Sequence, residues 1–311
     1  MERKPINKII AFFIFLMMPQ VVLLAQETIQ SGSSKVVIDV NKGGRVHQLF
    51  FGDHPLIFDG HEELAGSVWW PAPQTLWGWP PPKELDIEAY HLKEKTPSKV
   101  VVESKECSAL GLQLTKEYQL ITEHHFQVKY HAKNVSDKSV EFGHWEVSRV
   151  PKEGRVIVKV ESRFDDNIPL ANDKYLYFDH SSFDKIYSKE MKAIDFYVKE
   201  SDLELPYKNK NKLFVDSEGW VAYVKDTTVF IKIIKNENIK KITPSQGEVE
   251  IYVSPILPMV EIEEHSAYQK VKPKETSTWK VDWLMYQISE EDKANVLEWI
   301  EGKIKDFKAI N

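Results

Sequence analysis

The sequence contains 311 residues, of which 42% are hydrophobic, 12% aromatic and 28% charged, and its formal net charge is −6. This composition excludes a disordered chain, a collagen and a disulfide-stapled miniprotein. The acidic balance, with no stripe of lysine and arginine interleaved with aromatics, also argues against a nucleic-acid partner.

The first 25 residues have the order of a secretory signal peptide. Basic residues are followed by an uncharged apolar stretch at residues 9–24 and by the small residue Ala25. We expect cleavage before Gln26, one domain over residues 26–311, and a periplasmic or secreted protein without a membrane segment. The alternative is an uncleaved anchor, but a proline and a glutamine interrupt the stretch, and about 20 continuous apolar residues normally span a bilayer.

Period-two alternation of apolar and polar residues dominates the chain from residue 34 to 285 and predicts half-buried antiparallel strands. The clearest example is residues 126–133, where the apolar positions are Phe126, Val128, Tyr130 and Ala132. We expect further strands at residues 35–40, 45–51, 99–103, 111–120, 140–147, 155–160, 220–224, 229–234, 249–253, 259–263 and 279–285. So many strands without helical patterns between them predict an all-β sandwich.

An aromatic and proline cluster lies between Gly66 and Pro82, which hold four of the nine tryptophans and five of the sixteen prolines. Proline fixes φ and removes a donor, so we predict a stiff, extended loop instead of regular sheet. Flat rings on a rigid loop suit the apolar faces of pyranose sugars, and the candidate sugar-binding residues are Trp70, Trp77 and Trp79. The alternative is that these rings close one end of the sandwich core, because large rings usually bury.

Two segments later in the chain depart from the strand pattern. Residues 163–212 are rich in Asp, Lys, Asn and Tyr and predict long connections. The one good helical pattern is C-terminal, where Ser289 is the expected N-cap. One face of this helix carries Val296, Trp299, Ile300, Ile304 and Phe307. We expect this amphipathic helix to pack on the sandwich.

Two of the predicted strands carry groups suited to proton transfer. Alternation places His144 and Glu146 on one face of one strand, and Glu261 and Glu263 on one face of another. If both faces line one cleft, a histidine and a carboxylate form an acid/base pair suited to neutral pH. The alternative is that each face is merely the solvated side of its strand.

Several dispersed motifs resemble the galactose mutarotase-like (aldose 1-epimerase) superfamily. Residues 43–56 resemble its opening hairpin, and residues 116–144 resemble a strand pair that ends in a catalytic histidine. A set of short motifs is similar to an exported bacterial branch that is classed only as a domain of unknown function: WWPAPQ, WGWPP, GWVAYVK, GEVEIYV and VEIEEHS. The resemblance covers most of the chain between residues 35 and 286.

The resemblance implies a galactose mutarotase-like β-supersandwich with a sugar-sized concave face, followed here by the C-terminal helix. In mutarotases a histidine protonates the ring oxygen while a glutamate takes the proton of the anomeric hydroxyl. By position, His144 matches the histidine and Glu261 the glutamate. The resemblance thus implies an isomerase of the aldose 1-epimerase type. Glu146 and Glu263, which alternation places on the polar faces of the same two strands, are further sugar-binding candidates, and no cofactor is expected.

Three functions stay open on this evidence: a carbohydrate-binding isomerase, a non-catalytic glycan-binding or accessory protein of polysaccharide utilisation, and a glycoside hydrolase. The hydrolase rests on Glu261 and Glu263, whose backbones are about 6.6–7 Å apart along a strand, which overlaps the carboxyl spacing of glycosidases. No metal is expected, because the candidate histidines do not have the spacing of zinc ligands. The candidate histidines are His47, His54, His61, His124, His125 and His131.

Overall fold

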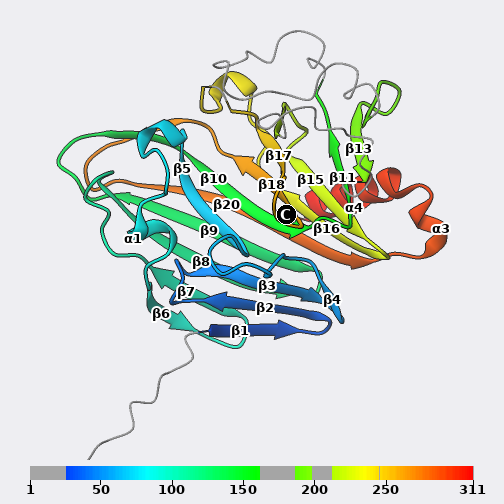
Figure 1. The fold of residues 1–311 in the computed structure, drawn as a ribbon, viewed down its shortest axis with the longest axis horizontal. Helices are drawn as coiled ribbons and strands as arrows, with labels where there is room; N and C mark the ends of the chain where they lie inside the picture. The colour runs from blue at the N-terminus through cyan, green and yellow to red at the C-terminus, as the bar shows by residue number, and fades with distance from the viewer. Residues whose placement is uncertain (1–25, 162–185, 198–211, 245, 311) are drawn as a thin grey trace, which may run out of the picture.

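Two large antiparallel sheets form the computed structural model, which describes residues 26–161, 186–197, 212–244 and 246–310 (Figure 1). In spatial order, sheet A consists of β1 (Gln26–Ser31), β2 (Ser34–Asp39), β3 (Arg45–Phe51), β5 (Ser67–Ala72), β10 (Val140–Pro151), β18 (Met259–His265), β17 (Val249–Val253) and β14 (Lys212–Val215), with β4 (His54–Pro55) beside β3 and β19 (Gln269–Val271) beside β10.

Sheet B consists, in spatial order, of β12 (Tyr187–Ser188), β13 (Ala193–Tyr197), β11 (Arg155–Lys159), β15 (Trp220–Lys225), β16 (Thr228–Ile233), β20 (Thr276–Gln287), β9 (His125–Asn134), β8 (Leu112–Thr122), β7 (Lys99–Glu103) and β6 (His91–Lys95). The helical segments are η1 (Gln74–Leu76), α1 (Lys83–Asp86), η2 (Ile239–Lys241), α3 (Glu290–Lys293) and α4 (Val296–Ile310). Figure 1 shows β1–β3 and β6–β8 at one end of the molecule, and β11, β13 and β15 at the other.

The main apolar core lies between the two sheets. Strand β9 buries Phe126, Val128 and Tyr130 in it, as the alternation of this segment predicts, and β20 adds Val281 and Trp283. We call the side of sheet A that contacts this core its inner face and the opposite side its outer face. The two-sheet architecture confirms the all-β sandwich predicted from the sequence, and all of the expected strands are present with small shifts at their ends.

The prediction of an irregular loop at residues 66–82 is wrong for its first part. Residues 67–72 form β5, which pairs with β10 along its whole length and with β3 only at Ser67. The nitrogen of Pro71 therefore needs no partner on the β3 side, where a missing N–H costs nothing. From Pro73 to Pro82 the chain is irregular apart from η1, as predicted.

The predicted C-terminal helix is present, although it is divided into α3 and α4. Ser289 caps α3, where its hydroxyl accepts a hydrogen bond from the backbone of Asp292. The predicted apolar face belongs to α4, whose buried Val296, Ile300 and Ile304 pack on the side of sheet B that faces away from sheet A. Figure 1 shows α4 beside β11 and β16.

Two other expectations concern segments that lie wholly or partly outside the described residues. The signal peptide lies outside the described residues, as does much of the interval 163–212. Within the described part of that interval, β12 and β13 replace the expected connections. Among the helices of the described ranges, none combines the length and apolar character needed to cross a bilayer.

Candidate functional site

Strand β10 presents two chemically different faces, and both contain polar groups. Its pairing with β5 places His144 opposite Pro71 and Trp145 opposite Trp70. Trp145 lies in an aromatic cluster on the outer face, separate from the main core. Since neighbouring residues of a strand point to opposite sides, His144 and Glu146 lie on the inner face, between the two sheets.

His144 is a core residue in this structure. It is fully buried, its Nδ1 accepts a hydrogen bond from Trp69 Nε1 at 3.0 Å, and its Nε2 lies 2.7 Å from Ser277 Oγ. Burial lowers the pKa of His144 to about 3, because the imidazolium form would lose its hydration. The ring is therefore neutral at physiological pH and holds the two sheets together through its hydrogen bonds.

Glu146 is also enclosed between the sheets. Its carboxylate accepts hydrogen bonds from Tyr130 Oη and from Trp283 Nε1, the latter at 3.0 Å, and lies 3.0 Å from Lys232 Nζ. Lys232 forms a second ion pair with Glu264. These partners come from sheet B and from β18, so Glu146 belongs to a buried network that connects the sheets and faces away from the tryptophan cluster.

The expected pairing of His144 with Glu261 across one cleft does not form. Glu261 pairs in register with Arg149 of β10, and its Oε1 accepts a hydrogen bond from Arg149 Nε at 2.8 Å. Arg149 is an odd-numbered outer-face residue of β10, so Glu261 lies on the outer face and His144 on the inner one. Residues that pair directly across two adjacent strands lie on the same face of the sheet. Glu261 and His265 therefore share the face of their partners Arg149 and Trp145, and sheet A separates them from His144.

The predicted tryptophans do gather on the outer face of sheet A. Trp70 contacts Trp77, Trp79 and Trp145, with ring centroids 5.9, 6.1 and 5.1 Å away. Trp70 and Trp145 are buried, Trp77 is partly buried, and Trp79 keeps 62% of its surface exposed. Trp70 and Trp145 therefore belong to the packed interior, as one alternative predicts, whereas Trp79 is exposed to a ligand, as the other predicts. We call Trp70, Trp77, Trp79 and Trp145 the tryptophan surface.

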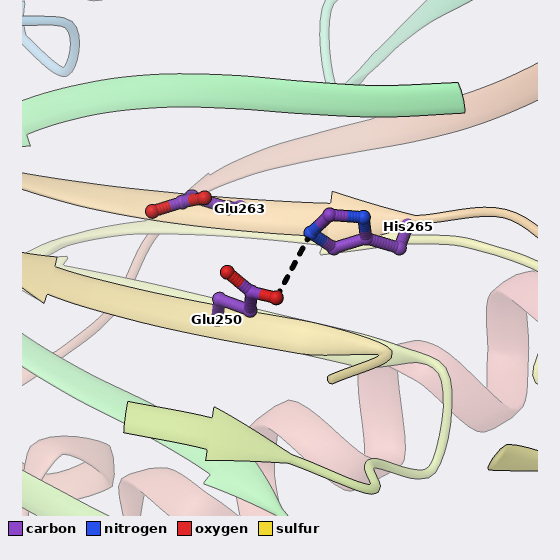
Figure 2. Close-up of side chains that lie close together, drawn as sticks. All are labelled: Glu250, Glu263 and His265. Atoms are coloured by element: carbon purple, nitrogen blue, oxygen red, sulfur yellow. Dashed lines mark ion pairs between the residues drawn. The ribbon is translucent and has the colours of Figure 1, made fainter. Parts of the chain in front are cut away.

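A cluster of charged groups adjoins the tryptophan surface through Trp145. Glu263 Oε2 accepts hydrogen bonds from Trp145 Nε1 at 2.7 Å and from Lys212 Nζ at 2.8 Å. Lys212 Nζ also lies 2.6 Å from Glu250 Oε2, and His265 Nε2 lies 3.2 Å from Glu250 Oε1. Figure 2 shows Glu263 and His265 on one strand and Glu250 on its neighbour, with the ion pair between His265 and Glu250.

The carboxylates of this cluster differ in their protonation. Burial raises the pKa of Glu263 to about 8, and the nearby carboxylates of Glu250 and Glu261 act in the same direction against Lys212. Burial would also raise the pKa of Glu250, but Lys212 and His265 lower it. Burial alone would lower the pKa of Lys212, whereas the two glutamates raise it. At neutral pH Glu263 is therefore largely protonated, whereas Glu250 is charged and pairs with Lys212.

Sequence reasoning missed Trp145, Lys212, Glu250 and His265 and included Glu263. The predicted strand ended at residue 263, one alternate position before His265, although Glu261, Glu263 and His265 follow a period of two. Glu250 could be found only through the register of β17 with β18, which places it opposite Glu263. Glu250, Glu263 and His265 each offer a ligand atom within 4.8 Å of the others, so they could hold a metal ion.

A family model described as "Domain of unknown function (DUF4380)" matches residues 71–286. This chain belongs to the DUF4380 family. The matched range includes Trp77, Trp79, Trp145 and the complete charged cluster. No curated protein matches the DUF4380 chain.

Solved structures of galactose mutarotase-like proteins share the fold of the DUF4380 chain. A galactose mutarotase related enzyme from Lactobacillus acidophilus has a TM-score of 0.56 at 12% identity and covers 85% of this chain and 98% of its own. A galactose mutarotase-like protein from Lactobacillus casei has a TM-score of 0.55 at 9% identity, over 84% and 100% of the two chains. One from Clostridium acetobutylicum has a TM-score of 0.51 at 11% identity, over 84% and 95%. The mutarotase-like fold is confirmed.

Proposed function

We propose that this protein binds a carbohydrate on the tryptophan surface, with the exposed ring of Trp79 as the first contact. The observation that carries this proposal is the exposure of 62% of a tryptophan held edge-on against a buried one, Trp70, at 6.1 Å. This ring continues into Trp70 and Trp77, and a contiguous apolar patch, unlike a single exposed residue, commonly marks a binding surface. Its neighbour Pro80 and the contact with Trp70 restrict its motion and lower the entropic cost of binding.

The chemistry next to the rings also suits a sugar. Pyranoses present apolar faces to aromatic rings and hydroxyl groups to charged or polar side chains. Arg149 is buried on this face of sheet A, with its guanidinium 5.6 Å from the ring of Trp70, and the partly exposed Glu261 that it pairs with is the group available to a sugar hydroxyl. The names of the mutarotase-like proteins that share this fold favour the same ligand class.

Binding without turnover is the function that the contacts favour over anomeric isomerisation. An isomerase needs an acid and a base at the sugar ring, and His144 lies in the core on the far side of sheet A from Trp79 and Glu261. The hydrolase hypothesis loses support as well, since Glu261 is paired with Arg149 and Glu263 with Lys212 and Trp145. We also propose that the protein acts outside the cytoplasm, on the basis of its N-terminal sequence.

The test compares Trp79→Ala with Ile256→Ala, which removes an exposed apolar side chain from the loop between β17 and β18. Titration of neutral hexoses, uronic acids and their oligosaccharides should change the tryptophan fluorescence of the wild-type protein. For the sugar that binds, Trp79→Ala should weaken affinity by about 1–3 kcal/mol, and Ile256→Ala should leave it unchanged.

Because Trp79 is largely exposed, its removal should leave the melting temperature within about 2 °C of the wild-type value. Unchanged affinity in Trp79→Ala would contradict the assignment of this ring. Absence of binding to every sugar of the panel would contradict the proposed function.

A further inference from the structure

We propose that Glu250, Glu263 and His265 bind a divalent transition-metal ion of the zinc type. The three side chains project from β17 and β18 on the outer face of sheet A and point toward a common space (Figure 2). Each contributes one oxygen or nitrogen, and these atoms lie within 4.8 Å of one another. The proposal is independent of the carbohydrate site and reverses the expectation from histidine spacing.

The first argument is the placement of two carboxylates directly opposite each other. Glu250 and Glu263 are register partners in adjacent antiparallel strands, and both are fully buried. Like charges in this position are destabilising, and burial strengthens their repulsion. Lys212 offsets part of it by contacting Oε2 of both glutamates at 2.6 and 2.8 Å. Lys212 is shared between the two carboxyl groups, so a second cation can bind there as Glu263 releases its proton, because metal ligands bind in their deprotonated form.

The second, independent argument is that polar atoms of this cluster lack hydrogen bonds. Among the described residues, Glu263 Oε1 and both ring nitrogens of His265 are inaccessible to solvent and make no hydrogen bond, although His265 Nε2 lies 3.2 Å from Glu250 Oε1. Native proteins pair nearly all such atoms, and a buried unpaired one commonly reports a bound water or ion. The residues that carry these unpaired atoms belong to the set of three whose ligand atoms lie within 4.8 Å of one another.

Each glutamate can serve both cations through different oxygen atoms. Lys212 contacts Oε2 of both glutamates, which leaves Oε1 of Glu263, Oε1 of Glu250 and Nε2 of His265 as the atoms we assign to the ion. Glu250 Oε1 accepts one hydrogen bond, from Gly247 N at 3.1 Å, and retains a second lone pair. Two oxygen or nitrogen ligands of one tetrahedral zinc ion are about 3.4 Å apart. The three groups, which lie within 4.8 Å of one another, would therefore move together by up to about 1.4 Å when an ion binds.

The donor set favours zinc over magnesium or calcium. An imidazole combined with two carboxylates is a common environment of Zn²⁺, whereas Mg²⁺ and Ca²⁺ prefer oxygen ligands alone. Three protein ligands would leave the fourth tetrahedral position for a water molecule or another exogenous group.

The test measures zinc binding to tag-free mature protein that has been stripped with a chelator. Calorimetric titration and elemental analysis should give one Zn²⁺ per chain, and Mg²⁺ or Ca²⁺ should not compete. His265→Gln and Glu263→Gln should weaken binding by more than about 10-fold. The matched control is Glu261→Gln, on the same strand and face but paired with Arg149, and it should bind zinc as the wild type does.

Two further measurements keep the proposal testable if a buried variant does not fold. Lys212→Met removes the competing ammonium and should bind zinc at least as tightly as the wild type. Anomalous diffraction at the zinc edge from wild-type crystals should show a peak between the three side chains. The proposal is overturned if the wild type binds no zinc, if the peak lies elsewhere, or if folded His265→Gln and Glu263→Gln bind zinc with wild-type affinity.

Discussion

His144 and Glu146 show what alternation can and cannot predict for a single residue. The sequence correctly places both on one face of a strand, but the period alone does not say whether that face meets solvent, a ligand or a second sheet. A buried histidine or glutamate is tolerated when its hydrogen bonds are satisfied, and here Trp69, Tyr130 and Trp283 satisfy them. Those partners are distant in sequence, so the inner position of the pair could not be predicted.

The buried, neutral state of His144 predicts a specific pH dependence of stability. Its pKa is about 3 in the folded protein and about 6.5 in the unfolded chain, so the unfolded state binds one more proton between these values. The free energy of unfolding should therefore decrease as the pH falls below about 6.5, with a contribution from this residue of up to about 1.4 kcal/mol per pH unit.

Chemical denaturation between pH 4.5 and 7 should separate this contribution from that of the carboxylates. His144→Gln cannot take up the proton, so its free energy of unfolding should decrease less steeply with falling pH than that of the wild type. His91→Gln, at an exposed position of β6, should retain the wild-type slope. Equal slopes in wild type and His144→Gln would contradict the assignment.

At the scale of elements, long and strongly periodic segments were predicted well, and segments with special local chemistry were not. Strand β9 and helix α4 each have a clear hydrophobic period that matches the face they bury. Strand β5 contains Pro71, whose missing N–H argued against sheet. The strand exists because the neighbouring β3 leaves that side unpaired, and no local pattern reports which neighbour a strand will have.

The packing of α4 on sheet B predicts a large stability cost for removing its central contact. Ile300 is fully buried against sheet B, so Ile300→Ala should lower the free energy of unfolding by about 2–5 kcal/mol through lost burial and the cavity left behind. Lys305→Ala, on the exposed side of the same helix, should change it by less than about 0.5 kcal/mol. Urea denaturation of both variants checks this, and a loss below about 1 kcal/mol in Ile300→Ala would show that α4 contributes little to the fold.

At the scale of the whole molecule, the fold class was predictable because the same period recurs in many strands, whereas the candidate site was only partly predictable. The outer face of sheet A combines β5 with β17 and β18, which are separated by more than half of the sequence. Trp70, Trp79 and Glu263 were recognised from composition and alternation. His265 follows the alternation of Glu261 and Glu263 just beyond the predicted strand, whereas Glu250 joins them only through strand register, which depends on how the sheet is assembled.

Export is the last prediction at this scale, and it concerns where the mature chain begins. Strand β1 starts at Gln26 and pairs with β2 from Gln26 opposite Asp39 to Ser31 opposite Ser34. Cleavage after Ala25 would remove the apolar segment and retain all residues of β1 that pair with β2, so processing and folding are compatible at this bond. Intact-mass analysis of protein from the periplasm or medium should give a chain that begins at Gln26.

Replacing the small residue before the expected cleavage site provides the matched test. Ala25→Leu should slow processing and leave precursor in the cell membrane, because signal cleavage requires a small side chain at this position. Gln30→Leu, five residues into the mature chain, should be processed normally. Retention of Met1 on membrane-bound wild-type protein, or equal processing of Ala25→Leu and wild type, would contradict cleavage at this bond.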